Sequence, residues 1–140
     1  PKYFLISILS KTSLLGWLNL LSLPQDIKEY FEDSIIVAHN ARFDLGVISK
    51  CLIRENIEIP KIRYMCTVDL SRKYIPAKSH KLNVLCDLLN IELNHHQADS
   101  DTKACMEIFL YINGQVKLSE FEIKNYVVKN KYYKWIFFGL

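Results

Sequence analysis

Two short acidic segments hold the residue types that are able to do chemistry in this 140-residue chain. The first is Ala38-His39-Asn40-Ala41-Arg42-Phe43-Asp44, in which a carboxylate follows an apolar, β-branched run over residues 35–38. The second is His95-His96-Gln97-Ala98-Asp99-Ser100-Asp101, in which His96 stands five positions before Asp101. Carboxylates bind hard cations, and an imidazole exchanges a proton near neutral pH. Cation binding and proton transfer are therefore the chemistry that these segments make available.

The surrounding pattern places each segment where a strand or a loop leads into a helix. The pattern predicts strands over 3–9, 35–38 and 62–66, and helices over 25–31, 40–54, 68–74, 81–89, 98–112 and 119–128. Asn40 and Thr67 are expected to cap two of these helices. The expected inward residues of the second and fourth helices are Phe43, Val47, Ile48, Cys51 and Leu52, and then Leu82, Leu85, Leu88 and Leu89. Alternating strands and helices favour an α/β layered fold.

Each acidic segment also has a purely structural interpretation. A carboxylate in the first turn of a helix is favoured by the helix dipole, which accounts for Asp44 without any function. In the second segment Asp99 or Ser100 is expected to act as a helix cap, with the histidines on a solvated loop. His39 is expected to be structural, and His95 and Asp99 receive no role.

Composition narrows the class of protein. Lys and Arg exceed Asp and Glu by 18 to 15, and this net charge of +3 permits a polyanionic partner without requiring one. No two of the four cysteines are close enough for a zinc knuckle or a redox pair, so we expect buried free thiols in a cytoplasmic protein. Residues 1–25 form an apolar segment that polar residues interrupt, which argues against a membrane helix. We divide the chain into this unassigned segment, a domain over 26–113, and a helical or irregular tail over 114–140.

Together the two segments resemble the DnaQ-like (DEDDh) family of 3′–5′ exonucleases, including the epsilon type of bacterial DNA polymerase III. Residues 36–44 are similar to the second exonuclease motif of that family, and residues 96–101 to the third motif in its His-containing form. Between them, Cys66-Thr67 and Ser79-His80-Lys81-Leu82 resemble parts of the family's strand-to-helix linker. The resemblance implies a ribonuclease H-like exonuclease fold, with a mixed sheet flanked by helices.

The resemblance also implies a site and a substrate. Asp44 and Asp101 would be metal ligands for two divalent cations, Mg or Mn, and His96 would be the general base that deprotonates the attacking water. The substrate would be the 3′ end of single-stranded DNA, with RNA as the alternative, and a DNA polymerase is a candidate partner. Nucleic-acid-binding residues stay unassigned, although Arg42, Arg72, Lys73, Lys78 and Lys81 flank the expected site.

One half of the family's carboxylate set is missing. The first motif of the family is D-x-E, and no Asp of this sequence is followed two positions later by Glu. We therefore expect the sequence to begin after the first strands of the domain, and this chain alone to have little or no nuclease activity. Residues 3–9 are expected to pair with the strand over 35–38 in place of those strands. The alternatives are a non-catalytic remnant that binds nucleic acid or a polymerase, the exonuclease module of a DinG-type helicase, or a ribonuclease of the same fold.

Overall fold

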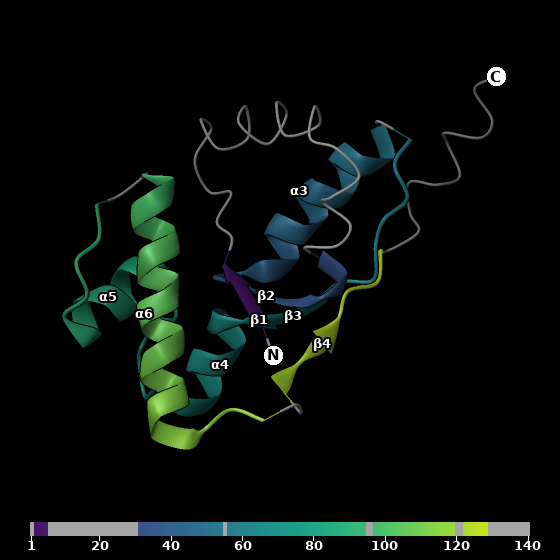
Figure 1. Ribbon diagram of the computed structural model, residues 1–140. Helices are drawn as coiled ribbons and strands as arrows, with labels where there is room; N and C mark the ends of the chain where they lie inside the picture. The colour runs from purple at the N-terminus through teal and green to yellow at the C-terminus, as the bar shows by residue number, and fades with distance from the viewer. Residues whose placement is uncertain (1, 6–30, 55, 95–96, 120–121, 129–140) are drawn as a thin grey trace.

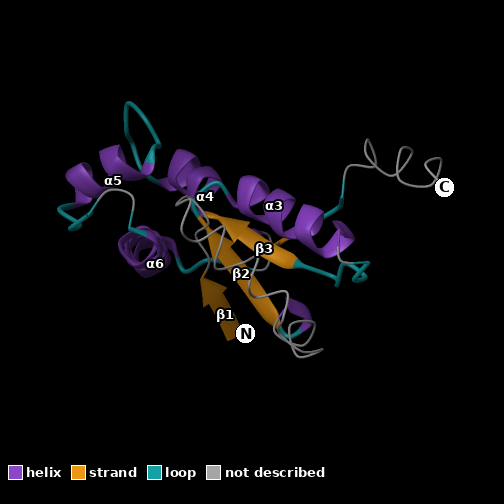
Figure 2. Ribbon diagram, turned by 90° about the horizontal axis from the view of Figure 1, so that it is seen from above, coloured by secondary structure: helices purple, strands orange, loops and turns teal. Residues whose placement is uncertain are grey.

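The computed structural model describes residues 2–5, 31–54, 56–94, 97–119 and 122–128. Within these residues the chain forms a mixed sheet with helices on both faces (Figures 1 and 2). The elements in chain order are β1 (Lys2–Leu5), β2 (Ser34–Ala38), α3 (Ala41–Arg54), β3 (Arg63–Cys66), α4 (Thr67–Tyr74), α5 (Leu82–Leu89), α6 (Ala98–Val116) and β4 (Lys124–Asn125). This α/β architecture agrees with the ribonuclease H-like exonuclease fold that the motifs imply.

The sheet has the strand order β1-β2-β3-β4. β1, β2 and β3 are mutually parallel, and β4 runs antiparallel to β3. All five residues of β2 are buried, as expected for a central strand of a parallel sheet that is covered on both faces. β1 pairs with β2 in the register Tyr3↔Ile35, which confirms the expected pairing for residues 3–5. Residues 6–9 and most of the helix expected over 25–31 lie outside the described residues.

Alternate residues of β2 and β3 enter two separate hydrophobic cores, because successive side chains of a strand point to opposite faces. On one face Ile36 and Tyr64 pack with the apolar residues of α3. On the other face Ile35, Val37 and Met65 pack with α4, α5 and α6. The sheet is therefore fixed between α3 and the other three helices.

The buried face of α3 differs from the face that the sequence predicts. Phe43, expected to point inward, is 50% exposed, while Asp44 and Leu45 are buried. A charged residue is normally expected on the outward face of a helix, so the sequence pattern places Asp44 outward and Phe43 inward. The buried carboxylate reverses both positions. The inward position expected for Leu88 of α5 is also wrong, since Leu88 is 50% exposed.

The expected helix caps are wrong as well. Thr67 is the first residue of α4 rather than its cap, and Cys66 takes the cap position without a side-chain hydrogen bond. Asn40 has a left-handed backbone (φ 66°), not the extended one of a helix N-cap. Gln97 takes the cap position of α6 in place of Asp99 or Ser100. The side chains of Thr67 and Ser100 hydrogen-bond elsewhere, to His39 and to the Asn94 amide.

The chain after α6 contradicts the helix expected over 119–128. α6 continues to Val116, and residues 124–125 form the short strand β4 beside β3. The carboxylate of Glu122 fastens this segment to α4, since it accepts hydrogen bonds from Lys73 Nζ at 2.9 Å and from the Tyr74 hydroxyl at 2.7 Å. It also accepts one from the Ser119 hydroxyl at 2.8 Å. Among the described helices, none is long and apolar enough to span a membrane.

The Glu122 contacts predict a loss of stability in acid. Hydrogen bonds from Lys73, Tyr74 and Ser119 lower the pKa of Glu122 from 4.5 to about 2. A lowered pKa stabilises the folded chain above the unfolded pKa, and this contribution disappears as the pH falls from about 4.5 to about 2. In urea unfolding across this range, the free energy of unfolding should fall more steeply for the natural chain than for Glu122→Gln. The exposed Glu92→Gln variant is the control, and equal slopes for all three chains would contradict the prediction.

Candidate active site

Asp44 reaches the carboxyl edge of the parallel strands because of the turn that follows β2. Asn40 adopts a positive φ of 66°, which Asn tolerates better than most residues, and the chain then enters α3 at once. Asp44 lies in the first turn of α3, where the helix dipole favours a carboxylate, and it is only 1% exposed. A carboxylate this deeply buried requires strong compensation, which is typical of a functional position.

Asp101 lies in the first turn of α6 and is 6% exposed. Cys105 follows one helical turn later on the same face, and its sulfur is 3.6 Å from the hydroxyl oxygen of Thr67. Thr67 directly follows β3. The start of α6 is therefore at the same edge of the sheet as the start of α3.

Two buried thiols are sensitive to the charge of the motif carboxylates. Burial raises the pKa of Cys105 to about 12, and the negative charge of Asp44 adds to this rise. Burial likewise raises the pKa of Cys86 to about 11, with a contribution from Asp101. Both thiols belong to the core between the sheet and α6. The two motif carboxylates therefore each act on a thiol of one and the same core.

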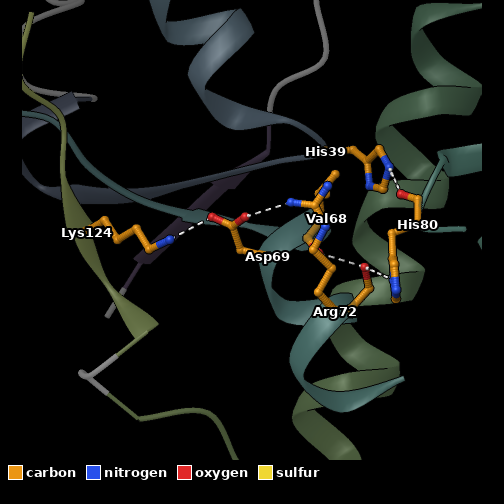
Figure 3. Close-up of polar contacts among 7 residues, drawn as sticks. His39, Val68, Asp69, Arg72, His80 and Lys124 are labelled. Carbon is orange, nitrogen blue, oxygen red and sulfur yellow. Dashed lines mark hydrogen bonds and ion pairs between the residues drawn. The ribbon is translucent and has the colours of Figure 1, made fainter. Parts of the chain in front are cut away.

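His39 joins three segments at this edge. Its Nδ1 atom is 2.9 Å from the Thr67 hydroxyl oxygen, and its Nε2 atom donates to the carbonyl oxygen of His80 at 3.1 Å. The His80 ring lies in turn 3.0 Å from the Ser71 hydroxyl of α4 (Figure 3). His39 is therefore structural, as expected from the sequence, and it ties the end of β2 to α4 and to the loop before α5.

The proton positions in this network follow from its acceptors. Burial lowers the pKa of His39 to about 4, so the ring is neutral near pH 7 and carries one proton. A carbonyl oxygen only accepts, so this proton belongs on Nε2, and Nδ1 accepts from the Thr67 hydroxyl. The protonated Cys105 thiol is then the donor to the Thr67 oxygen. Hydrogen bonds consequently run in one direction from Cys105 through Thr67 to His39.

The histidine expected to act as the general base cannot be placed. His95 and His96 lie outside the described residues. Within the described ranges no group of three or more His, Cys, Asp or Glu side chains forms a metal cluster. The partnership of His39, Thr67 and Cys105 was not predicted from the sequence. The only signal for it is that His39 and Thr67 each follow a predicted strand.

Comparison with known proteins identifies the family of this chain. The model of the family described as "Exonuclease" matches residues 21–109, so the chain belongs to the exonuclease family. It is 35% identical over 96 residues to a PolC-type DNA polymerase III of Bacillus subtilis, which covers 66% of this chain and 7% of that protein. It is 31% identical over 102 residues to the DNA polymerase III subunit epsilon of Buchnera aphidicola, which covers 67% of this chain and 42% of the relative.

A third relative carries the exonuclease activity in its name. The chain is 34% identical over 87 residues to the 3′-5′ exonuclease DinG of Staphylococcus epidermidis, a match that covers 61% of this chain and 10% of the relative. The chain therefore spans less than half the length of each of these three relatives. These matches confirm the resemblance to the DnaQ-like exonucleases.

The hydrogen-bond network predicts that the Thr67 hydroxyl is more important than its methyl group. Thr67→Val keeps the shape but leaves the buried Nδ1 of His39 without its donor, which costs about 1–3 kcal/mol. Thr67→Ser keeps the hydroxyl and loses one methyl group, which costs roughly 1 kcal/mol. Urea unfolding at pH 7 measures both variants. A valine variant as stable as the serine variant would show that the hydroxyl adds no stability and would contradict the prediction.

Proposed function

We propose that this chain is an exonuclease domain of the type that hydrolyses single-stranded DNA from the 3′ end, in proofreading or repair. The observation that carries the proposal is the burial of two motif carboxylates, Asp44 and Asp101, in helix first turns at one edge of the sheet. The names of the relatives support the substrate and the direction, since two are DNA polymerase III proteins and one is a 3′-5′ exonuclease. RNA is the alternative substrate, and a DNA polymerase is the partner that we propose.

Divalent cations fit the donor groups of this site. Mg²⁺ and Mn²⁺ prefer carboxylate oxygens, and Mg²⁺ in particular is commonly held by one or two carboxylates together with water and substrate phosphates. Asp44 and Asp101 would supply those two carboxylates. His39 and Cys105 are both neutral near pH 7, so neither cancels the negative charge that attracts a cation. Bound cations of this kind activate water and stabilise the leaving 3′ oxygen.

The proposed role of the chain's own residues follows from their chemistry. Asp44 and Asp101 would hold the reacting phosphate in place through the ions that they bind. His96 would accept the proton of the attacking water, because an imidazole has a pKa close to the operating pH. The neutral cluster around His39 would keep the two helix starts in position without entering the reaction.

Two cations need more carboxylates than these two. The 140-residue sequence contains no D-x-E, so we propose that the isolated chain holds one divalent cation at Asp44 and Asp101 and hydrolyses DNA poorly, if at all. The same absence favours the second candidate function, a non-catalytic domain that binds nucleic acid or a polymerase. An exonuclease module of a helicase like DinG, or a ribonuclease, would share the site and differ in substrate.

Calorimetric titration with Mn²⁺ tests the proposed cation site. The natural chain should show one binding event, and Asp101→Asn should weaken it at least about tenfold because a neutral amide is a poorer ligand for a hard cation. Asp99→Asn is the matched control, since Asp99 lies in the same helical turn but is exposed. Equal affinities for the Asp101→Asn and Asp99→Asn variants, whether retained or lost, would contradict the assignment.

A digestion assay tests the proposed lack of turnover. The isolated chain, incubated with Mg²⁺ or Mn²⁺ and a single-stranded DNA labelled at its 5′ end, should leave the DNA essentially full length. Robust shortening from the 3′ end that Asp44→Asn abolishes would overturn this expectation and show that the two carboxylates suffice.

A further inference from the structure

A groove of about 780 Å³ opens at the carboxyl edge of β3, beside the start of α3. It lies between the first turn of α3, the outer side of α4, the loop before α5 and β4. Four cationic side chains line it, namely Arg42, Arg72, Lys81 and Lys124, together with a single carboxylate, Asp69. The groove thus differs in charge from the buried Asp44–Asp101 edge, although Arg42 belongs to the same helical turn as Asp44.

Asp69 forms ion pairs with two cations of this groove, Arg72 and Lys124, which both stay exposed to solvent. Lys124 Nζ lies 2.6 Å from one oxygen of Asp69, and Arg72 reaches the other oxygen at 3.8 Å from the opposite side (Figure 3). The side chains of Arg72 and Lys124 are still 64% and 42% exposed. Exposed ion pairs contribute little free energy, so a phosphate oxygen can share or replace the carboxylate at small cost.

Arg42 lines the groove from the first turn of α3. A hydrogen bond with Tyr64 raises the pKa of Arg42, and the charge of Asp69 contributes to this rise. The Arg42 side chain is exposed, so its guanidinium is open to an incoming anion. Arg72 and Lys124 thus pair with Asp69, and Arg42 lines the same groove.

The groove carries an excess of positive charge, because four cationic side chains line it against one carboxylate. With neutral histidines, the groove has a net charge of +3, which equals the formal net charge of all 140 residues. The remaining residues therefore sum to zero. A basic patch on a chain that is otherwise balanced is typical of a surface that binds a polyanion.

We propose that this groove binds the sugar–phosphate backbone of the DNA strand whose 3′ end reaches Asp44 and Asp101. The proposal rests on the proposed function, and it adds a strand-binding surface with named residues. Among the described lining residues none is Phe, Tyr or Trp, so base stacking contributes little, and binding through phosphates should not depend on base sequence. Arg42 is the link between the two sites, because it lines the groove two residues before Asp44.

Fluorescence anisotropy of a labelled oligothymidylate, measured in EDTA over a range of salt concentrations, tests the proposal. In the variant with Arg72→Ala and Lys81→Ala, binding should weaken about tenfold at low salt. The slope of log affinity against log salt should become shallower by about 1.4, since each single-strand phosphate contact contributes about 0.7. The matched control combines Lys61→Ala and Arg63→Ala, two exposed cations at the opposite end of β3, and should keep the natural slope.

Two further measurements complete the test. One asks whether the charge of Arg72 is sufficient without its shape, and the other whether the groove binds a strand rather than a single nucleotide. Arg72→Lys keeps the charge and should retain the slope of the natural chain. Thymidine monophosphate, at the same total nucleotide concentration, should compete poorly with the strand. Equal effects of the two double variants, no strand binding by the natural chain, or full competition by the mononucleotide would each overturn the proposal.

These measurements distinguish failure of the groove from failure of the proposed cation site. Asp101→Asn should leave strand binding in EDTA unchanged, and the Arg72 and Lys81 double variant should leave the heat of Mn²⁺ binding unchanged. Loss of the Mn²⁺ event with intact strand binding would reject the cation site alone. Loss of the salt-slope effect with intact Mn²⁺ binding would reject the groove alone.

Discussion

The parallel pairing of β2 with β3 is the constraint on which the rest of the structure depends. Its register sets Ala38 opposite Cys66, so the two strands end side by side. The residues that follow, His39 and Thr67, are then close enough for a contact of 2.9 Å. A shift of one residue would turn every side chain of β2 to the other face of the sheet. The two cores, the start of α3 and the contact with α6 all require this one alignment.

His39 and Cys105, two of the groups buried at this edge of the sheet, are both neutral near pH 7. His39 loses its charge because burial disfavours the imidazolium, and Cys105 keeps its proton because burial disfavours the thiolate. Both nitrogens of the His39 ring have hydrogen-bond contacts, so the burial of this polar side chain is compensated. Neither group therefore brings a positive charge to this edge of the sheet. The absence of such a charge is compatible with the cation site that we propose at Asp44 and Asp101.

Much of this arrangement was predictable from the sequence, because the strands and long helices have strong periodic patterns. The β-branched run over 35–38 is a fully buried strand, and the two motifs led to Asp44 and Asp101 in helix first turns. The errors have physical causes. Phe43 was assigned to the core because a buried carboxylate beside it reverses the usual rule of polar residues outward.

Contacts between side chains that are far apart in the sequence could not be predicted from periodic patterns. Thr67 is a residue type that often caps a helix, but its hydroxyl has other partners, namely His39 after β2 and Cys105 of α6. β4 has only two residues, which is too short for a periodicity to predict, and it exists through its pairing with β3. The cationic groove likewise depends on residues from four separate segments, so no single stretch of sequence indicates it.

The central claim is that Asp44 and Asp101 share one cation. Anomalous diffraction from crystals of the chain grown with Mn²⁺ tests it most directly, because the ion is located without any assumption about activity. A single strong peak is expected at the edge of the sheet, bonded directly to a carboxylate oxygen of each residue. A peak bonded to only one of them, or no peak in a crystal saturated with Mn²⁺, would show that the two carboxylates do not share an ion.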